Sequence, residues 1–233
     1  MSRRRFAAVT AWAAFSVPGD AADTYAEEYP DALVQFIQRK INALNERWDT
    51  RRAALRTAAE VEERNRYVRR KFVEMIHGLP ERTPLDPRVV SVHQRDGYRI
   101  ENILFQSRPD FWVNASLYLP DGAGPHPAVL SPCGHADEGH VYQVYQQAHV
   151  DMVKGGLVVL TYDPIGQGER RVYWNPRTGE TEVGGCTYEH SMFGHMLLLM
   201  GEDMAHYRIW DGMRGIDYLL TRPEVNARRI GCA

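Results

Sequence analysis

Cysteine is scarce in this sequence, with three residues among 233, at Cys133, Cys186 and Cys232. Three widely spaced cysteines are too few for a disulfide framework, so a buried thiol is the default for each, although one bridge stays open. An excess of one charge sign is also missing, because 28 Lys and Arg residues face 30 Asp and Glu residues. A net charge of −2 excludes nucleic-acid or membrane-surface binding driven by bulk charge.

Internal repeats, low-complexity tracts and interdomain linkers are absent, and no apolar run is long enough for a permanent membrane span. The N-terminus has a basic segment (2–6), a short apolar segment (7–17) and a small-residue exit (18–22). This order predicts an export signal in residues 1–22, and its Ser-Arg-Arg-x-Phe start resembles the twin-arginine motif. The predicted location is periplasmic or extracellular. The alternative is a disordered basic N-terminus of a cytosolic protein.

Residues 23–80 are predicted to form a helical extension. Apolar residues recur at helical spacing from Asp31 to Asn45, and a second helix is expected from Glu46 to His77, where Gly78 and Pro80 end it. Arginines crowd the second helix, but Asp and Glu residues are interleaved with them. Alternating charges of this kind indicate a solvated face with ion pairs.

Residues 81–233 begin with the two-residue period of β-strands. Further along, predicted strands and helices follow one another. Alternation over 98–105 and 112–119 predicts a hairpin, with a turn between the two strands. The short apolar runs 127–131 and 157–162 are typical of parallel strands buried on both faces, and a crossover helix over 141–154 joins them.

The last part of the chain predicts one more helix and one more strand. Residues 163–201 are rich in glycine and are expected to form a long functional loop. A helix is predicted over 203–221 and the opening of a strand over 229–233. Together these elements predict an α/β fold, a mixed and mostly parallel sheet with flanking helices.

Candidate site residues follow the parallel strands, because ligands of open parallel sheets bind at the carboxyl ends of the strands. Gly134 allows a close backbone approach after the first strand, and the amide of His135 or Ala136 is a candidate donor to a developing oxyanion. After the second strand, Asp163 is followed by glycines that allow a tight turn. The glycines of this predicted structural turn are Gly166 and Gly168.

Six motifs of this chain occur together, and any one of them is weak alone. They are Pro132–His135, Tyr162–Arg170, Glu189–His190, Tyr207–Arg214, Arg222–Asn226 and Arg229–Gly231. The combination resembles the α/β-hydrolase superfamily and, more narrowly, the acetyl xylan esterase-like carbohydrate esterases.

The resemblance implies an incomplete α/β-hydrolase fold and a serine esterase. No metal and no cofactor are expected. In the family the strand that starts at Arg229 continues into Gly-x-Ser-x-Gly. The nucleophile, the acid and the catalytic histidine are therefore expected after Ala233, and this chain alone is expected to be inactive. Of the family's active-site residues, the resemblance assigns only the oxyanion-hole segment to this chain, at Gly134 and His135. The expected substrate is a small-molecule or carbohydrate ester, with acetyl esters foremost; no nucleic-acid partner is expected, and the oligomeric state is not readable.

Several alternatives stay open at this stage. Glu189 and His190 are either substrate-side residues in the long loop or anchors of that loop. The enzyme could be a dienelactone-hydrolase-like or peptidase-like relative, or the chain could be a non-catalytic binding remnant. An internal nucleophile would be Ser131, Ser191 or Cys133. Its possible bases would be His135, His140, His190 and His195.

Two further interpretations of the polar residues are a metal site and an ion pair. Cys133, His135, His140 and His149 cluster in sequence, but their spacing matches no tetrahedral zinc pattern. Asp211 and Arg214 are spaced for an ion pair on one helix and are expected to be structural.

Overall fold

The computed structural model describes residues 31–233, so the export signal predicted at 1–22 lies outside the described residues. The chain divides into two compact units with the boundary between Tyr67 and Val68. No helix in the described range has the length and apolar character needed to cross a membrane.

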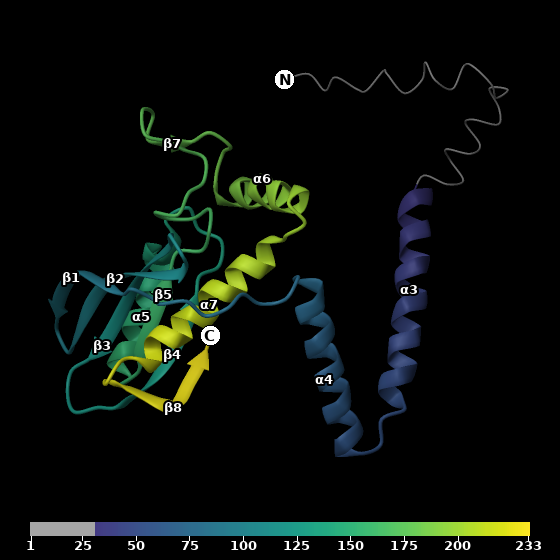
Figure 1. Ribbon diagram of the computed structural model, residues 1–233, viewed down its shortest axis with the longest axis horizontal. Coiled ribbons are helices and arrows are strands. Elements are labelled where there is room, and N and C mark those ends of the chain that lie inside the picture. Colours follow the sequence, from purple (N-terminus) through teal and green to yellow (C-terminus); the bar gives the residue numbers. More distant parts are fainter. Residues whose placement is uncertain (1–30) are drawn as a thin grey trace. The chain divides into compact units, whose positions relative to one another are not determined.

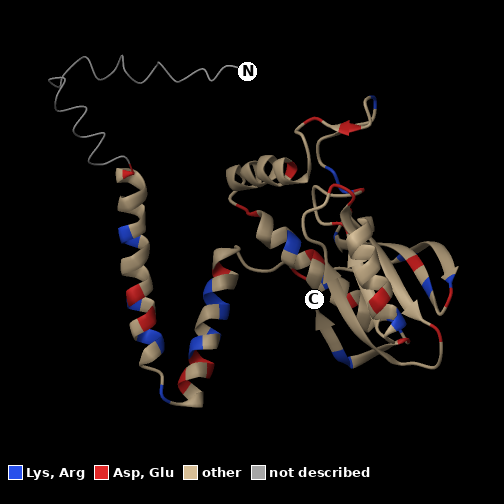
Figure 2. Ribbon diagram, turned by 180° about the vertical axis from the view of Figure 1, so that it is seen from behind, with Lys and Arg blue, Asp and Glu red and all other residues tan. Residues whose placement is uncertain are grey.

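The N-terminal extension contains two helices, as predicted, but the break between them was misplaced. Helix α3 spans Ala32–Ala53 and helix α4 spans Ala58–Met75. The break lies at 54–57 because Thr57 and Glu60 form a capping box: the Glu60 carboxylate accepts from the Thr57 N–H at 2.9 Å, and Thr57 Oγ1 accepts from the Glu60 N–H at 3.3 Å. Charges of both signs alternate along both helices, as Figure 2 shows, and Arg66 pairs with Glu63 at 2.8 Å.

Six strands form one sheet in the order β1-β2-β3-β5-β4-β8. Their bounds are Arg88–Arg95 (β1), Tyr98–Arg108 (β2), Phe111–Pro120 (β3), His126–Pro132 (β4), Val158–Tyr162 (β5) and Val225–Cys232 (β8). The predicted hairpin is β2–β3, and β1 extends it into a meander.

The sheet is mixed, as predicted. Strands β4, β5 and β8 are parallel neighbours, whereas β3 runs antiparallel to both β2 and β5. Strands β2, β4, β5 and β8 therefore all run in one direction. The last strand begins at Val225, before the predicted start, because Val225 already pairs with His126.

Two helices cover opposite faces of the sheet (Figure 1). Helix α5 (Gln143–Lys154) is the predicted crossover and packs Val153 against Tyr118 and Val159. Helix α7 (Met204–Leu220) packs Tyr218 and Leu219 against the main core, which includes Phe105, Leu117 and Leu160. Successive buried residues of β3 point to opposite faces of the sheet, as in any β-strand.

The long loop predicted after β5 is only partly a loop. It contains the short hairpin of β6 (Trp174–Asn175) and β7 (Glu180–Thr181), and then helix α6 (Cys186–Leu199). The helix was missed because most of its polar residues lie in its first half and its apolar residues in its second half, so no amphipathic stripe along one face marks it in the sequence.

Candidate active site

The carboxyl ends of β4, β5 and β8 meet at one edge of the sheet, because the three strands are parallel neighbours. The turn at 133–136 follows β4, and the turn at 163–170 follows β5. This is the edge where the sequence places the oxyanion segment and the structural turn.

Gln167 ties these two turns together. Its side chain is fully buried, and Nε2 donates to the backbone oxygens of Gly134 at 2.8 Å and Ala136 at 3.0 Å. In a planar trans peptide the C=O and N–H groups point in opposite directions. The N–H of His135 shares its peptide unit with the Gly134 oxygen, so Gln167 turns that N–H away from itself.

The predicted oxyanion donors are free of protein acceptors. Gly134 and His135 are exposed, and in the described residues neither the His135 nor the Ala136 backbone N–H donates a hydrogen bond. An N–H group that is fixed in direction and unpaired can serve a developing negative charge without reorganisation.

The buried carboxylate of Asp163 stabilises the turn after β5. The side chain is 1% exposed. One carboxylate oxygen accepts from His140 Nδ1 at 2.6 Å and from the His140 N–H at 2.8 Å. The other accepts from Asn114 Nδ2 at 2.6 Å and from the Glu169 N–H at 2.9 Å. Burial by itself raises the pKa of Asp163, but the hydrogen bonds from His140, Asn114 and Glu169 outweigh it and hold the pKa below its ordinary value.

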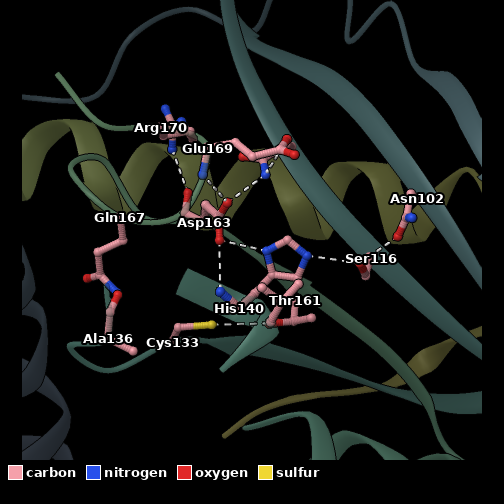
Figure 3. Close-up of polar contacts among 12 residues, drawn as sticks. Asn102, Ser116, Cys133, Ala136, His140, Thr161, Asp163, Gln167, Glu169 and Arg170 are labelled. Atoms are coloured by element: carbon pink, nitrogen blue, oxygen red, sulfur yellow. Dashed lines mark hydrogen bonds and ion pairs between the residues drawn. The ribbon is translucent and has the colours of Figure 1, made fainter. Parts of the chain in front are cut away.

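Ser116, His140 and Asp163 form a row that has the order of a catalytic triad but not its function. His140 Nε2 lies 2.9 Å from Ser116 Oγ, and the Ser116 hydroxyl donates to Asn102 Oδ1 at 2.8 Å (Figure 3). Its hydrogen is thus directed away from His140. Ser116 is only 4% exposed in the middle of β3, so no substrate reaches its oxygen. The row joins the β2–β3 hairpin to the carboxyl edge and is structural.

Two glycines make room for the Asp163 carboxylate. A Cβ atom on Gly168 would lie 2.1 Å from Asp163 Oδ2, and one on Gly139 would lie 2.0 Å from Oδ1. Gly168 also has a φ of +54°, which side-chain-bearing residues rarely adopt. The predicted role of Gly168 in a tight turn thus has a second cause, the close approach of a buried carboxylate.

We expect Gly168→Ala to lower the free energy of unfolding by about 2–4 kcal/mol, because the new methyl group displaces the Asp163 carboxylate. Gly179→Ala is the matched control, since Gly179 has a φ of +70° with no atom within 4 Å of the added Cβ. It should cost only the backbone strain, about 1–2 kcal/mol. Urea unfolding of both variants measures the difference, and equal losses would contradict the proposed crowding.

Glu189 and His190 lie on α6, not in a loop. Glu189 is fully buried and accepts from the Val172 N–H at 2.6 Å and from Thr181 Oγ1 at 2.5 Å. Glu189 therefore anchors the β6–β7 hairpin, which is the anchoring role considered for it from the sequence. The ring of His190 packs on the ring of His135, with centroids 5.0 Å apart. Its two ring nitrogens are buried without a hydrogen-bond partner in the described structure, and burial lowers its pKa.

The candidate internal nucleophiles are poorly placed for catalysis. Burial raises the pKa of Cys133 to about 11, so the reactive thiolate is scarce at neutral pH. Ser131 Oγ lies 3.1 Å from His149 Nε2, but burial lowers the pKa of His149 to about 4 and its Nδ1 has no partner in the described structure to orient the ring. Ser191 donates to the Thr187 carbonyl of its own helix.

The four side chains weighed as metal ligands are divided among different contacts. Cys133 contacts Thr161, His140 binds Asp163, His149 contacts Ser131, and His135 packs on His190. Within the described range, no three His, Cys, Asp or Glu side chains are grouped to hold a metal ion.

The ion pair expected between Asp211 and Arg214 is wrong, although both residues are structural. Asp211 pairs with Arg170 at 2.7 Å, and Arg214 pairs with Asp217 at 2.6 Å. Arg214 points toward the segment before β1, where it also donates to the Thr83 carbonyl. Asp211 instead faces the turn after β5, so the helix α7 binds two different segments through these residues.

Comparison with known proteins supports the architecture. No protein-family model matches the chain. The crystal structure of a "putative acetyl xylan esterase" from Bacteroides fragilis NCTC 9343 superposes with a TM-score of 0.61 at 20% identity, over 75% of this chain and 47% of that one. "Methylesterase BT1017" superposes with a TM-score of 0.57 at 20% identity, over 79% of this chain and 38% of that one. The fold is that of the α/β-hydrolases.

A sequence comparison also finds a similar protein. The "Putative hydrolase YtaP" of Bacillus subtilis (strain 168) is 26% identical over 174 residues, which cover 70% of this chain and 53% of that protein. The chain thus spans about half the length of the relatives it matches. In the α/β-hydrolase fold the carboxyl edge described above is the side that carries the nucleophile elbow.

Proposed function

We propose that this chain forms the oxyanion side of the active site of a serine esterase that hydrolyses acyl esters, acetyl esters of carbohydrate foremost. The observation that carries the proposal is the His135 N–H, unpaired and held in direction by Gln167 at the carboxyl edge. The names of the similar structures, an acetyl xylan esterase and a methylesterase, support the reaction class. We further propose that the protein is exported, from the pattern in residues 1–22.

The proposed mechanism uses the carboxyl edge of the sheet. A serine at the end of β8 would attack the ester carbonyl after a histidine takes its proton, and the tetrahedral oxyanion would accept from the His135 N–H. The tetrahedral intermediate would collapse to an acyl-serine as the C–O bond of the ester breaks, and the leaving alcohol would take the proton from the histidine. Water, deprotonated by the same histidine, would then attack the acyl-serine and release the acid and the free serine. We propose that this serine, its histidine and the acid that orients the histidine follow residue 233 in the gene. Residues 1–22, 23–80 and 81–233 would be the signal, the helical extension and the first part of the catalytic domain.

The first test is the coding sequence after the codon for Ala233. We expect an in-frame Gly-x-Ser-x-Gly within about five residues. A stop codon at that place would overturn the proposal that the gene encodes an intact esterase.

The second test is activity. We expect the protein expressed with the following coding sequence to hydrolyse 4-nitrophenyl acetate and to release acetate from acetylated xylan, and residues 1–233 alone to do neither. The variants Ser131→Ala and Cys133→Ala of the 233-residue chain are controls. Turnover by that chain that Ser131→Ala abolishes and Cys133→Ala leaves intact would contradict the proposed position of the nucleophile.

A further inference from the structure

A cavity of about 750 Å³ lies over the part of the sheet formed by β1, β2 and β3. Its floor consists of Val90 and Ser91 of β1, Asn102 and Leu104 of β2, and Asn114 of β3. In the strand order, β5 and β4 separate these strands from β8. The cavity therefore lies toward the opposite end of the sheet from the strand after which the proposed serine follows.

The walls of the cavity are two segments that continue from the candidate active site. Glu138 lines it from the loop that follows the oxyanion segment, and Glu169 and Arg171 line it from the turn after β5 and the residues next to it. Gln167 ties these two segments together through its hydrogen bonds to the oxyanion segment. The cavity and the proposed oxyanion donor thus belong to the same two stretches of chain.

Trp174 gives the cavity an anchored aromatic wall. Its side chain is 47% exposed, although tryptophan is among the largest apolar residues. It lies in the β6–β7 hairpin, which the buried Glu189 holds through the Val172 N–H and Thr181 Oγ1. The guanidinium of Arg171 lies over the indole ring, 5.5 Å from its centroid. A ligand that covers this ring gains the free energy of burying its apolar surface.

The polar groups at the cavity include both donors and acceptors. Glu138 and Glu169 are exposed carboxylates, and Arg171 has N–H donors. Asn114 is only 8% exposed; its Nδ2 donates to Asp163 at 2.6 Å and to Glu169 at 3.2 Å, whereas its Oδ1 has no partner in the described structure. A buried oxygen without a donor costs about 1–3 kcal/mol, so a ligand that supplies a hydroxyl there is favoured.

We propose that this cavity binds a sugar unit of the carbohydrate whose ester is hydrolysed at the carboxyl edge. The inference rests on the proposed esterase function. A sugar unit fits because each hydroxyl both donates and accepts, as the mixed polar groups require, while the C–H face of the ring packs on Trp174 and Leu104. A neutral sugar fits better than a cation, because the exposed carboxylates are hydrated and the buried one, Asp163, already has its donors.

Binding is measured by isothermal titration calorimetry on the protein expressed with the coding sequence after Ala233. The probes are xylohexaose, mannohexaose and cellohexaose, with spermidine as the cationic comparison. We expect at least one oligosaccharide to bind, and Trp174→Ala to raise its Kd at least about tenfold. The control Tyr188→Ala removes an exposed aromatic residue of α6 that does not line the cavity, and it should leave the Kd unchanged.

Activity gives a second readout that a merely structural role of Trp174 would not move. Trp174→Ala should raise KM for the acetylated form of the oligosaccharide about tenfold, while kcat/KM for 4-nitrophenyl acetate stays within about twofold, because that small ester has no sugar to bind. Glu169→Gln keeps the volume but loses the charge, and charged acceptors form the stronger hydrogen bonds. It should raise the Kd for the oligosaccharide about threefold to tenfold.

The outcomes separate the two proposals. Oligosaccharide binding that depends on Trp174, in a protein without esterase activity, would support the sugar site and contradict the proposed function. Hydrolysis of 4-nitrophenyl acetate by a protein that binds none of the three oligosaccharides would overturn the sugar site and leave the esterase intact. Binding of spermidine alone, or unchanged oligosaccharide binding in folded Trp174→Ala, would also overturn the sugar site. If Trp174→Ala does not fold, Glu169→Gln and Trp174→Phe decide by the same measurement.

Discussion

Asp163→Asn should lower the free energy of unfolding by about 3–5 kcal/mol. The buried carboxylate accepts four hydrogen bonds, from the ring and backbone of His140, from Asn114 and from Glu169. Asparagine has nearly the same shape but presents an NH₂ group to donors on one side. At least one of the buried N–H groups that donate to this side chain is then left facing another donor.

Urea unfolding at neutral pH measures this loss, and Asp151→Asn is the matched control. Asp151 is exposed on α5, and its carboxylate accepts a hydrogen bond from the exposed side chain of Gln147. The control should change stability by less than about 0.5 kcal/mol. Similar losses for the two variants would show that the buried carboxylate does not hold the turn.

The same carboxylate makes stability depend on pH in a definite direction. Because the folded pKa of Asp163 is below its ordinary value of 3.8, its contribution is fully present above that value. The contribution is lost as the pH falls through the folded pKa. Unfolding curves between pH 6 and pH 2.5 should therefore show a steeper loss of stability for the unmodified protein than for Asp163→Asn.

If the proposed esterase function is correct, Gln167→Met should lower kcat of the protein expressed with the coding sequence after Ala233 about tenfold to a hundredfold. Methionine fills a similar volume but donates to neither the Gly134 nor the Ala136 oxygen. The peptide unit that carries the His135 N–H is then free to rotate, and the oxyanion donor loses its direction.

The free energy of unfolding and KM distinguish a positioning role of Gln167 from a folding defect. Gln167→Met should lower the free energy of unfolding by about 1–3 kcal/mol, because one buried donor is removed and the Ala136 oxygen keeps a bond from the Gly139 N–H. KM for 4-nitrophenyl acetate should change less than kcat. The control Gln143→Met alters an exposed glutamine at the start of α5 and should change neither constant. A normal kcat in folded Gln167→Met would contradict the positioning role.

The sequence predicts the sheet well because its strands follow simple periodic rules. The alternation in 98–105 and 112–119 and the short apolar runs before Pro132 and Asp163 correspond to β2, β3, β4 and β5. The helix α7 also matches its prediction, and Asp203 caps it by accepting from the His206 N–H at 2.8 Å. Each of these signals is local, so the sequence alone is sufficient to read them.

The parts that the sequence misses depend on tertiary contacts. Gln167 is one polar residue in a glycine-rich turn, and nothing local shows that its side chain reaches back to the turn after β4. His140 was weighed only as a base or a ligand, because its contacts with Asp163 and Ser116 join three separate segments. The helix α6 lacks an amphipathic pattern. The Thr57–Glu60 capping box was the one readable signal that could have placed the break between the first helices.

The strand order also sets a sequence of events in folding. The β2–β3 hairpin closes across a two-residue turn, whereas β4 pairs with β8 through residues far apart in the chain, such as Ala128 and Ile230. The entropy of closing a loop grows with its length, so the hairpin forms at a small entropic cost and the β4–β8 ladder at a larger one. We therefore expect β8 to join the sheet after the β2–β3 hairpin has formed, and until it does the β4 edge of the sheet is unpaired.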